Sequence, residues 1–365
     1  MSVGQEPLDD LERHLLGGTR HLTRIEVSER AGVPLDVAEE LWGRLGFPHT
    51  ADDDVAFTQQ DADALRTAAE LVGMGILEPE SQAALIRTWG RSYARLAEWQ
   101  TSLLAGIALA DDDPLSRIDQ LLTEVLPRVG ALQDYVWRRH LENAAQRLLP
   151  QAEAGDEQRL TAVVFIDIVG YTSRSRNLSE SELVDLVEVF EDGTTQMVVS
   201  VGGRVIKTIG DEVLFVVDDA EAAVEAGLEL AARGEDEDDD FPRVRVGVTY
   251  GPVTYRLGDV FGPTVNIASR LTSLARPGSV LVDRGAFDAL TGTPADPDRD
   301  QDPGPDGTPL ARLIDRAADE LAEISPFAEH GELRFRRLRR VSVKGYRHLE
   351  PWVVRRRRPR GQEEG

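Results

Sequence analysis

Two aspartates interrupt apolar, β-rich runs and could together hold a divalent cation. Asp167 lies in the run VVFIDIVG, residues 163–170, and Asp211 lies between two such runs in VIKTIGDEVLFVV, residues 205–217. The second pattern predicts a β-hairpin with Asp211 at its turn. If the first strand lies beside this hairpin, the two carboxylates meet at one edge of a sheet. They would repel each other there, and a divalent cation makes such an arrangement favourable.

Either aspartate alone is more typical of a cap or a turn, so it is the pair that favours a metal site. The turn VGYTSRS, residues 169–175, follows the first aspartate with a glycine and small hydroxyl residues. Backbone N–H groups in such a turn can face a polyphosphate, although the turn alone is weak evidence.

A third candidate element is the segment DVFGPTVNIASRL, residues 259–271. Pro263 suits the first turn of a helix, which places Asn266 and Arg270 four residues apart on one face. A solvated helix face would give the same pattern. The planar guanidinium of Arg270, amid apolar and small residues, is also well shaped to bind a phosphoryl group.

The composition narrows the classes of protein. The chain has 365 residues, which favours two or three domains, and no cysteine, which leaves carboxylates as the main candidate metal ligands. No apolar stretch approaches the roughly 20 residues that span a bilayer, and no signal peptide begins the sequence, so we expect a cytoplasmic protein. The formal net charge of −24 repels nucleic acid and makes DNA binding unfavourable.

The hydrophobic period divides the chain into a helical half and a half with short strands. We expect a helical regulatory domain over residues 1–115, a helical linker over 116–157, a catalytic domain over 158–356 and a tail over 357–365. An acidic insertion is expected at about 293–309. In the second half, predicted strands at 162–167, 204–208, 213–217, 244–250 and 279–282 alternate with predicted helices at 180–200, 219–233 and 263–275, which indicates an α/β or α+β sandwich.

The segment TRIEVSERAGVPLDVAEELWGRLGF, residues 23–47, resembles the helix-turn-helix head of merR-type regulators. A helix-turn-helix is also a general packing unit, and its second helix here carries more acids than bases. We therefore interpret the segment as a regulatory module rather than a DNA reader.

Five blocks, in order, resemble the catalytic domain of class III nucleotidyl cyclases: FIDIVGYT, KTIGDEVLFVV, RVGVTYGPV, GDVFGPTVNIASRL and VSVKGY. The resemblance covers about residues 159–355 and implies an α+β, ferredoxin-like and palm-like catalytic domain. The helical half resembles the autoinhibitory domain of some actinobacterial adenylyl cyclases.

The resemblance implies roles for particular side chains. Two Mg²⁺ or Mn²⁺ ions in each active site would be held by Asp167, Asp211 and the carbonyl of Ile168. The remaining substrate-binding roles follow the family motifs: selection of adenine by Lys207 and Asp259, orientation of the ribose by Asn266, charge stabilisation at the α-phosphate by Arg270, and binding of the terminal phosphates by Arg245 and Lys344.

The resemblance further implies an adenylyl cyclase that makes 3′,5′-cyclic AMP and pyrophosphate from ATP by a two-metal mechanism. Each site would form between the two subunits of a homodimer. The alternatives are a guanylyl cyclase, a diguanylate cyclase, which the hairpin IGDEV disfavours, or a weakly active nucleotide-sensing or DNA-binding regulator. The acidic insertion leaves the placement of Lys344 open. The N-terminal signal could be a small molecule, a lipid or a proton, with His140 in the linker as a candidate for the last.

Overall fold

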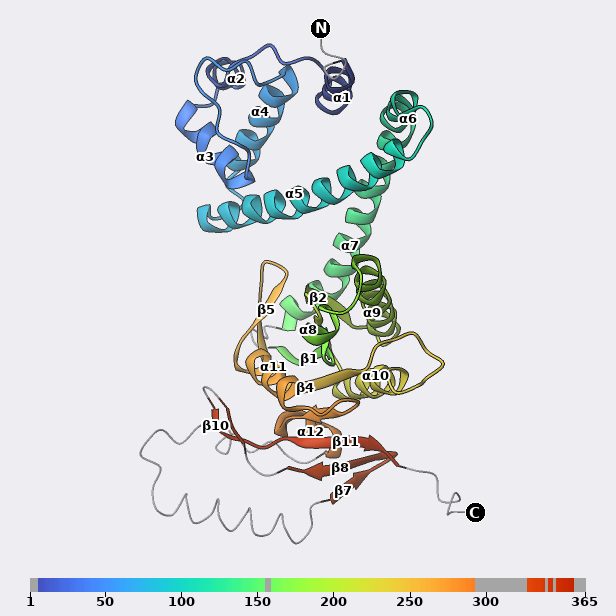
Figure 1. Cartoon of the computed structure of the whole chain (residues 1–365). Helices are drawn as coiled ribbons and strands as arrows, with labels where there is room; N and C mark the ends of the chain where they lie inside the picture. Colours follow the sequence, from blue (N-terminus) through green and yellow to red (C-terminus); the bar gives the residue numbers. More distant parts are fainter. Residues whose placement is uncertain (1–5, 155–158, 293–326, 339–340, 344–345, 358–365) are drawn as a thin grey trace. The chain divides into compact units, whose positions relative to one another are not determined.

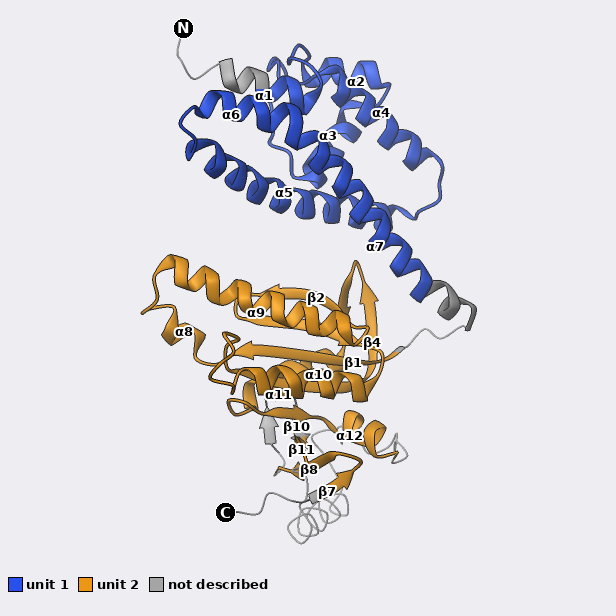
Figure 2. Cartoon of the chain, turned by 90° about the vertical axis from the view of Figure 1, so that its right-hand side faces the viewer, with its two compact units in different colours: residues 1–155 blue, residues 156–365 orange. Residues whose placement is uncertain are grey.

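The computed structural model describes residues 6–154, 159–292, 327–338, 341–343 and 346–357. Internal contacts divide the chain into two compact units, Met1–Gly155 and Asp156–Gly365. Figure 2 colours these units separately.

The first unit is built from helices in its described part, as the sequence predicts. Its helices are α1 (Glu6–Leu16), α2 (Arg24–Ala31), α3 (Leu35–Leu45), α4 (Gln59–Gly73), α5 (Pro79–Leu109), α6 (Pro114–Gln120), the π-helix η1 (Leu121–Val125) and α7 (Leu126–Ala154). None of the helices in the described ranges of either unit is both long enough and apolar enough to cross a bilayer.

The predicted helix-turn-helix is formed by α2 and α3. Thr23 and Glu26 form a capping box that starts α2, and Gly32 ends it in the left-handed region at φ 71°. An isolated β-bridge joins Leu22 to Phe57 just before α4. The buried side chains of this unit's small core are Leu22, Val27, Ala31, Val33, Ala38, Ala62 and Leu65.

One arginine on each helix of this motif is paired with acidic side chains. The guanidinium of Arg24 contacts Glu39, at 2.5 Å, and Asp52, while Arg44 is paired with Glu40 on the same helix. Nucleic-acid phosphates are bound by available Lys and Arg side chains, and these two arginines are already engaged by acids in the described part of the chain.

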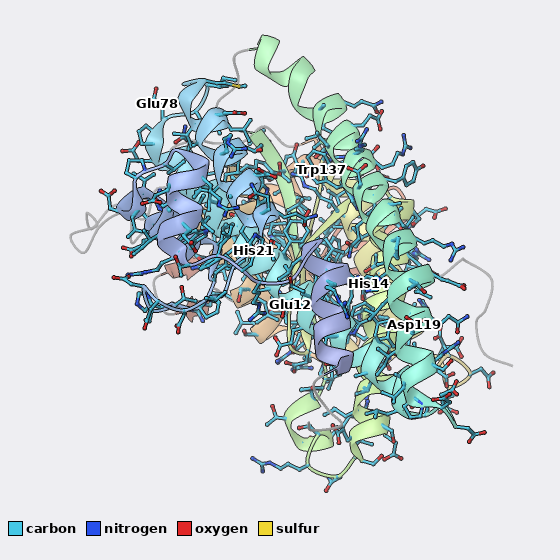
Figure 3. The ribbon with its side chains drawn as sticks, turned by 90° about the horizontal axis from the view of Figure 1, so that it is seen from above. Glu12, His14, His21, Glu78, Asp119 and Trp137 are labelled. Carbon is cyan, nitrogen blue, oxygen red and sulfur yellow. The ribbon has the colours of Figure 1, made fainter. Side chains whose placement is uncertain are left out.

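The two longest helices carry large apolar side chains that are solvent-exposed. Trp89 and Trp99 on α5 and Trp137 on α7 are 43%, 62% and 52% exposed. Figure 3 labels Trp137 among the side chains of this unit. Both long helices in the described part of this unit therefore expose large apolar side chains to solvent.

The second unit begins with a βαββαβ arrangement. It consists of β1 (Arg159–Ile168), the short helix α8 (Tyr171–Arg174), α9 (Glu180–Ser200), β2 (Arg204–Ile209), β3 (Glu212–Val217), α10 (Ala220–Arg233) and β4 (Val244–Arg256). The strands lie in the order β2-β3-β1-β4 and all pair antiparallel. This is the ferredoxin-like fold that the family resemblance implied.

Further strands extend this sheet beyond β4 (Figure 1). The order continues through β6, parallel to β4, to β11, β8 and β7, while β5 pairs with the far end of β4 and β9 pairs with β10. These later elements are β5 (Asp259–Phe261), α11 (Pro263–Leu274), β6 (Val280–Val282), α12 (Arg284–Thr291), β7 (Phe327–His330), β8 (Leu333–Arg337), β9 (Val341–Val343), β10 (Tyr346–Leu349) and β11 (Trp352–Arg356). The acidic insertion predicted at 293–309 lies outside the described residues.

Both faces of the central sheet are covered because β1 is apolar on both sides. Its residues Val164 and Ile166 belong to the core that contains Phe190 of α9 and Val224 of α10. Val163 and Phe165 belong to a second core, with Ala268 of α11. Side chains alternate along a strand, so Asp167 projects to the same face as Val163 and Phe165.

Helix α11 packs very closely on this second face. A Cβ at Gly247 of β4 would lie 2.5 Å from the carbonyl oxygen of Ala268 and from the amide nitrogen of Thr272. The hydroxyl of Thr272 donates to the carbonyl of Phe165 at 3.2 Å, and the hydroxyl of Thr249 donates to the carbonyl of Thr264 at 3.0 Å. The missing side chain at 247 therefore allows direct contact between helix and strand backbones.

Candidate active site

The carboxylate of Asp167 lies near the end of β1 in a row of charged residues across three strands. Glu212 is directly opposite it on β3, and Arg245 is directly opposite it on β4. The residue Asp167 is 8% exposed. The acid that interrupts the apolar run thus occupies a nearly buried position between one acidic and one basic neighbour.

Arg245 forms an ion pair with this acid. Its Nε donates to Oδ2 of Asp167 at 2.5 Å. The Arg245 side chain remains 37% exposed, whereas that of Asp167 is only 12% exposed. A charge-assisted hydrogen bond of this kind is stronger than a neutral one.

Asp211 lies at the tip of the β2–β3 hairpin, as the sequence predicts, and approaches Asp167. Its backbone carbonyl accepts a hydrogen bond from the amide of Ile168 at 3.0 Å. Burial raises the pKa of Asp167, the ion pair with Arg245 opposes that rise, and the charge of Asp211 adds to it. The structure therefore brings the two predicted acids together.

A third acid, Glu212, belongs to the same group and was not identified from the sequence. Burial, followed by the charges of Asp167 and Asp211, raises the pKa of Glu212 to about 7. Its position next to Asp211 was the available signal, but strand pairing was needed to place it opposite Asp167.

Asp167, Asp211 and the carbonyl of Ile168 are called the Asp167 corner below. Their oxygen atoms suit a hard divalent cation. Carboxylate and carbonyl oxygens are the ligands that Mg²⁺ and Mn²⁺ prefer, and Mg²⁺ usually takes only one or two carboxylates, completing its shell with water and substrate phosphates. Within the described residues, no group of three or more His, Cys, Asp or Glu side chains is arranged to hold a metal. Asp167, Asp211 and the carbonyl of Ile168 are the candidate ligands for such a smaller set.

A second pair of predicted residues is in direct contact. Lys207 of β2 donates from Nζ to Oδ2 of Asp259 on β5 at 2.6 Å, while Oδ1 of Asp259 accepts from the amide of Val260 at 2.8 Å. The side chains of Lys207 and Asp259 are 40% and 30% exposed. A donor and an acceptor are thus held side by side where a ligand can reach both.

Asn266 and Arg270 both lie on α11 and are exposed, as their spacing predicts. The helix buries Ala268 and Leu271 instead. Within the described ranges, neither Asn266 nor Arg270 forms a side-chain hydrogen bond or ion pair, so no such contact links them to the Asp167 corner of the same chain. Lys344 lies outside the described residues.

Comparison with known proteins identifies the family. Residues 155–301 match the family profile "Adenylate and Guanylate cyclase catalytic domain". The chain is 38% identical over 299 residues to an adenylate cyclase of Glutamicibacter nicotianae, covering 76% of this chain and 74% of the relative. It is 39% identical to an adenylate cyclase of Streptomyces coelicolor, covering 80% and 77%. The chain belongs to the class III nucleotidyl cyclases.

Among solved structures, the cyclase is similar to the catalytic core of a rhodopsin-guanylyl cyclase with converted specificity in complex with ATPαS. That match has 20% sequence identity and a TM-score of 0.41, and covers 56% of this chain and 99% of the other. The family profile and the actinobacterial relatives confirm the predicted family, and the described elements confirm the predicted class of fold, a helical N-terminal region followed by a cyclase domain built on a mixed sheet.

Proposed function

We propose that this cyclase converts ATP to 3′,5′-cyclic AMP and pyrophosphate at sites shared between two copies of the chain. The observation that carries the choice of ATP is the contact between Lys207 and Asp259. An ammonium donor beside a carboxylate acceptor complements the edge of adenine, which offers ring-nitrogen acceptors and an amino donor. The actinobacterial relatives named adenylate cyclase support the same choice.

In this proposal Asp167, Asp211 and the carbonyl of Ile168 hold two Mg²⁺ or Mn²⁺ ions. The bound cations supply acidification of the ribose 3′-hydroxyl and neutralisation of phosphate charge. Asn266 orients the ribose, and Arg270 stabilises the negative charge that develops at the α-phosphate. Arg245 and Lys344 bind the terminal phosphates, because guanidinium and ammonium groups are the usual phosphate partners in proteins.

We infer a homodimer because no side-chain contact in the described part of one chain links Asn266 or Arg270 to Asp167. Asn266 and Arg270 point away from their own sheet and lack partners in the described chain. A second copy can complete the site by setting its Asp167 corner and Arg245 opposite these residues. Such a head-to-tail pair has two equivalent sites.

We also propose that the N-terminal helical unit regulates this activity in a cytoplasmic enzyme, through residues 116–157 as a linker. Part of that linker is α7, on which His140 is exposed. A small molecule, a lipid or a proton would act by favouring one of two dimer arrangements.

The test is product formation by purified full-length protein with Mn²⁺, given ATP or GTP in parallel. We expect cyclic AMP from ATP and much less cyclic GMP from GTP. A preference for GTP would favour the guanylyl cyclase alternative. The absence of both products, together with a DNA mobility shift at physiological salt, would favour the regulator alternative.

A further inference from the structure

The ion pair between Arg245 and Asp167 places a positive charge where a metal ion would bind. We propose that, without nucleotide, Arg245 occupies the position of a cation at Asp167, so that the enzyme binds divalent metal tightly only together with a polyphosphate. This inference rests on the proposed function, in which Asp167 is a metal ligand and Arg245 binds phosphate. It makes Arg245 a positioning residue that couples the two ligands.

The strand register imposes the pairing. Asp167 and Arg245 are directly opposite on the antiparallel strands β1 and β4. Side chains in such positions start about 4.5–5.5 Å apart at Cβ and are the nearest neighbours on that face. The guanidinium therefore meets the carboxylate without any rearrangement of the backbone, and its Nε reaches Oδ2 at 2.5 Å.

The charges favour this arrangement when no other cation is present. Asp167 and Glu212 are opposite each other, and the charge of Asp211 acts on both. Arg245 is the basic residue that acts on this acidic group within the described part of the chain. Moving it away without replacing its charge would leave three carboxylates close together, which is unfavourable.

A metal ion and the guanidinium would compete for the same carboxylate. Oδ2 of Asp167 accepts the Arg245 hydrogen bond, and two positive groups on one carboxylate repel each other. Arg245 is the partner that can leave, because 37% of its side chain is exposed while Asp167 is largely enclosed. A polyphosphate offers the departing guanidinium new oxygen acceptors.

The expected consequence is positive coupling between metal and nucleotide. A phosphate that draws Arg245 away frees Asp167 for the cation, and a bound cation frees Arg245 for the phosphate. Because coupling between two ligands is reciprocal, each should raise the affinity for the other.

The test measures Mn²⁺ binding by electron paramagnetic resonance on full-length protein without nucleotide. Arg245→Gln should bind Mn²⁺ about tenfold more tightly than the wild type. The charged hydrogen bond from Arg245 to Asp167 is then absent and no longer competes with the cation for that carboxylate. Arg243→Gln is the matched control, since Arg243 pairs with Glu235 at 2.8 Å and should leave Mn²⁺ affinity unchanged. Arg245→Met, which keeps the aliphatic stem, replaces the first variant if that one does not fold.

A second arm adds 3′-deoxy-ATP, which lacks the hydroxyl that the proposed reaction uses. It should strengthen Mn²⁺ binding by the wild type much more than by Arg245→Gln. Equal nucleotide-free Mn²⁺ affinities in folded wild type and folded Arg245 variants would overturn the inference. A different result would contradict the proposed function itself: an Asp167→Asn variant that keeps both its Mn²⁺ binding and its cyclase activity.

Discussion

Lys207 and Asp259, 52 positions apart in the sequence, meet at 2.6 Å between β2 and β5. Asp259→Asn removes the carboxylate charge while keeping the size of the side chain. We expect kcat/KM for ATP to fall about tenfold or more and the preference for ATP over GTP to shrink, because the site loses part of its adenine contact. An exposed ion pair contributes about 1 kcal/mol or less to stability, so thermal unfolding should change little. Unchanged selectivity would remove the pair from base recognition.

Asp211→Ala should lower cyclic AMP formation by about 100-fold or more, since even partners that merely support a metal ligand cost 10–100-fold when lost. Asp192→Ala, an exposed acid on α9, is the matched control and should retain activity. Activity should be assayed over a range of Mn²⁺ concentrations. Substantial turnover by the Asp211 variant would refute its assignment as a metal ligand.

Mixing two inactive variants tests the shared site. In the proposed dimer, each site takes Asp167 from one chain and Arg270 from the other. A heterodimer of the Asp167→Ala and Arg270→Ala chains therefore contains one site with both residues intact and one site that lacks both. We expect the mixture to recover up to about one quarter of wild-type activity, for random exchange between subunits. Each variant assayed alone at the same total concentration is the control. No recovery, in a mixture shown by sedimentation to contain dimers, would contradict the model.

Removing residues 1–151 should raise cyclase activity, because the helical unit would no longer favour an inactive dimer arrangement. The two units are compact in themselves, which makes this truncation reasonable. Activity and sedimentation should be measured at matched concentrations, so that a change in dimerisation is separated from a change in turnover. Identical kinetics for the two proteins would reduce the N-terminal unit to a tether.

Glu212 should make the metal-free protein less stable as pH rises. The pKa of Glu212 is raised from 4.5 to about 7 in the folded protein. Its contribution to the free energy of unfolding is therefore most favourable below pH 4.5 and is lost as pH rises through about 7. Glu212→Gln should therefore gain a few degrees in Tm over the wild type at pH 8 in EDTA, and lose that advantage at pH 5. A constant difference in Tm at both pH values would contradict the assigned electrostatics.

Much of the site was predictable because its residues lie in local patterns. The β-rich runs on both sides of IGDE predicted the hairpin that carries Asp211, and Pro263 predicted the first turn of the helix that carries Asn266 and Arg270. The helix-turn-helix was predictable for the same reason, since its caps and turn are local.

Contacts between strands were not predictable in the same way. The positions of Glu212 and Arg245 on either side of Asp167 depend on which strands pair and in which register. The strands β7, β8 and β11 were also not placed from the sequence, because all three are short and β8 and β11 are rich in arginine. In addition, β11 pairs with β6, which lies far earlier in the chain. The catalytic and binding roles of Asp167, Glu212 and Arg245 are predictions.

The absent side chain at Gly247 has a mechanical consequence. Because α11 packs directly on the backbone of β4, Asn266 and Arg270 belong to the same closely packed layer as Arg245. In the proposed homodimer, little sliding would be available within one protomer, so the shared site would open and close by movement of one protomer against the other. The proposed regulatory signal would then need only to change the angle between the two protomers.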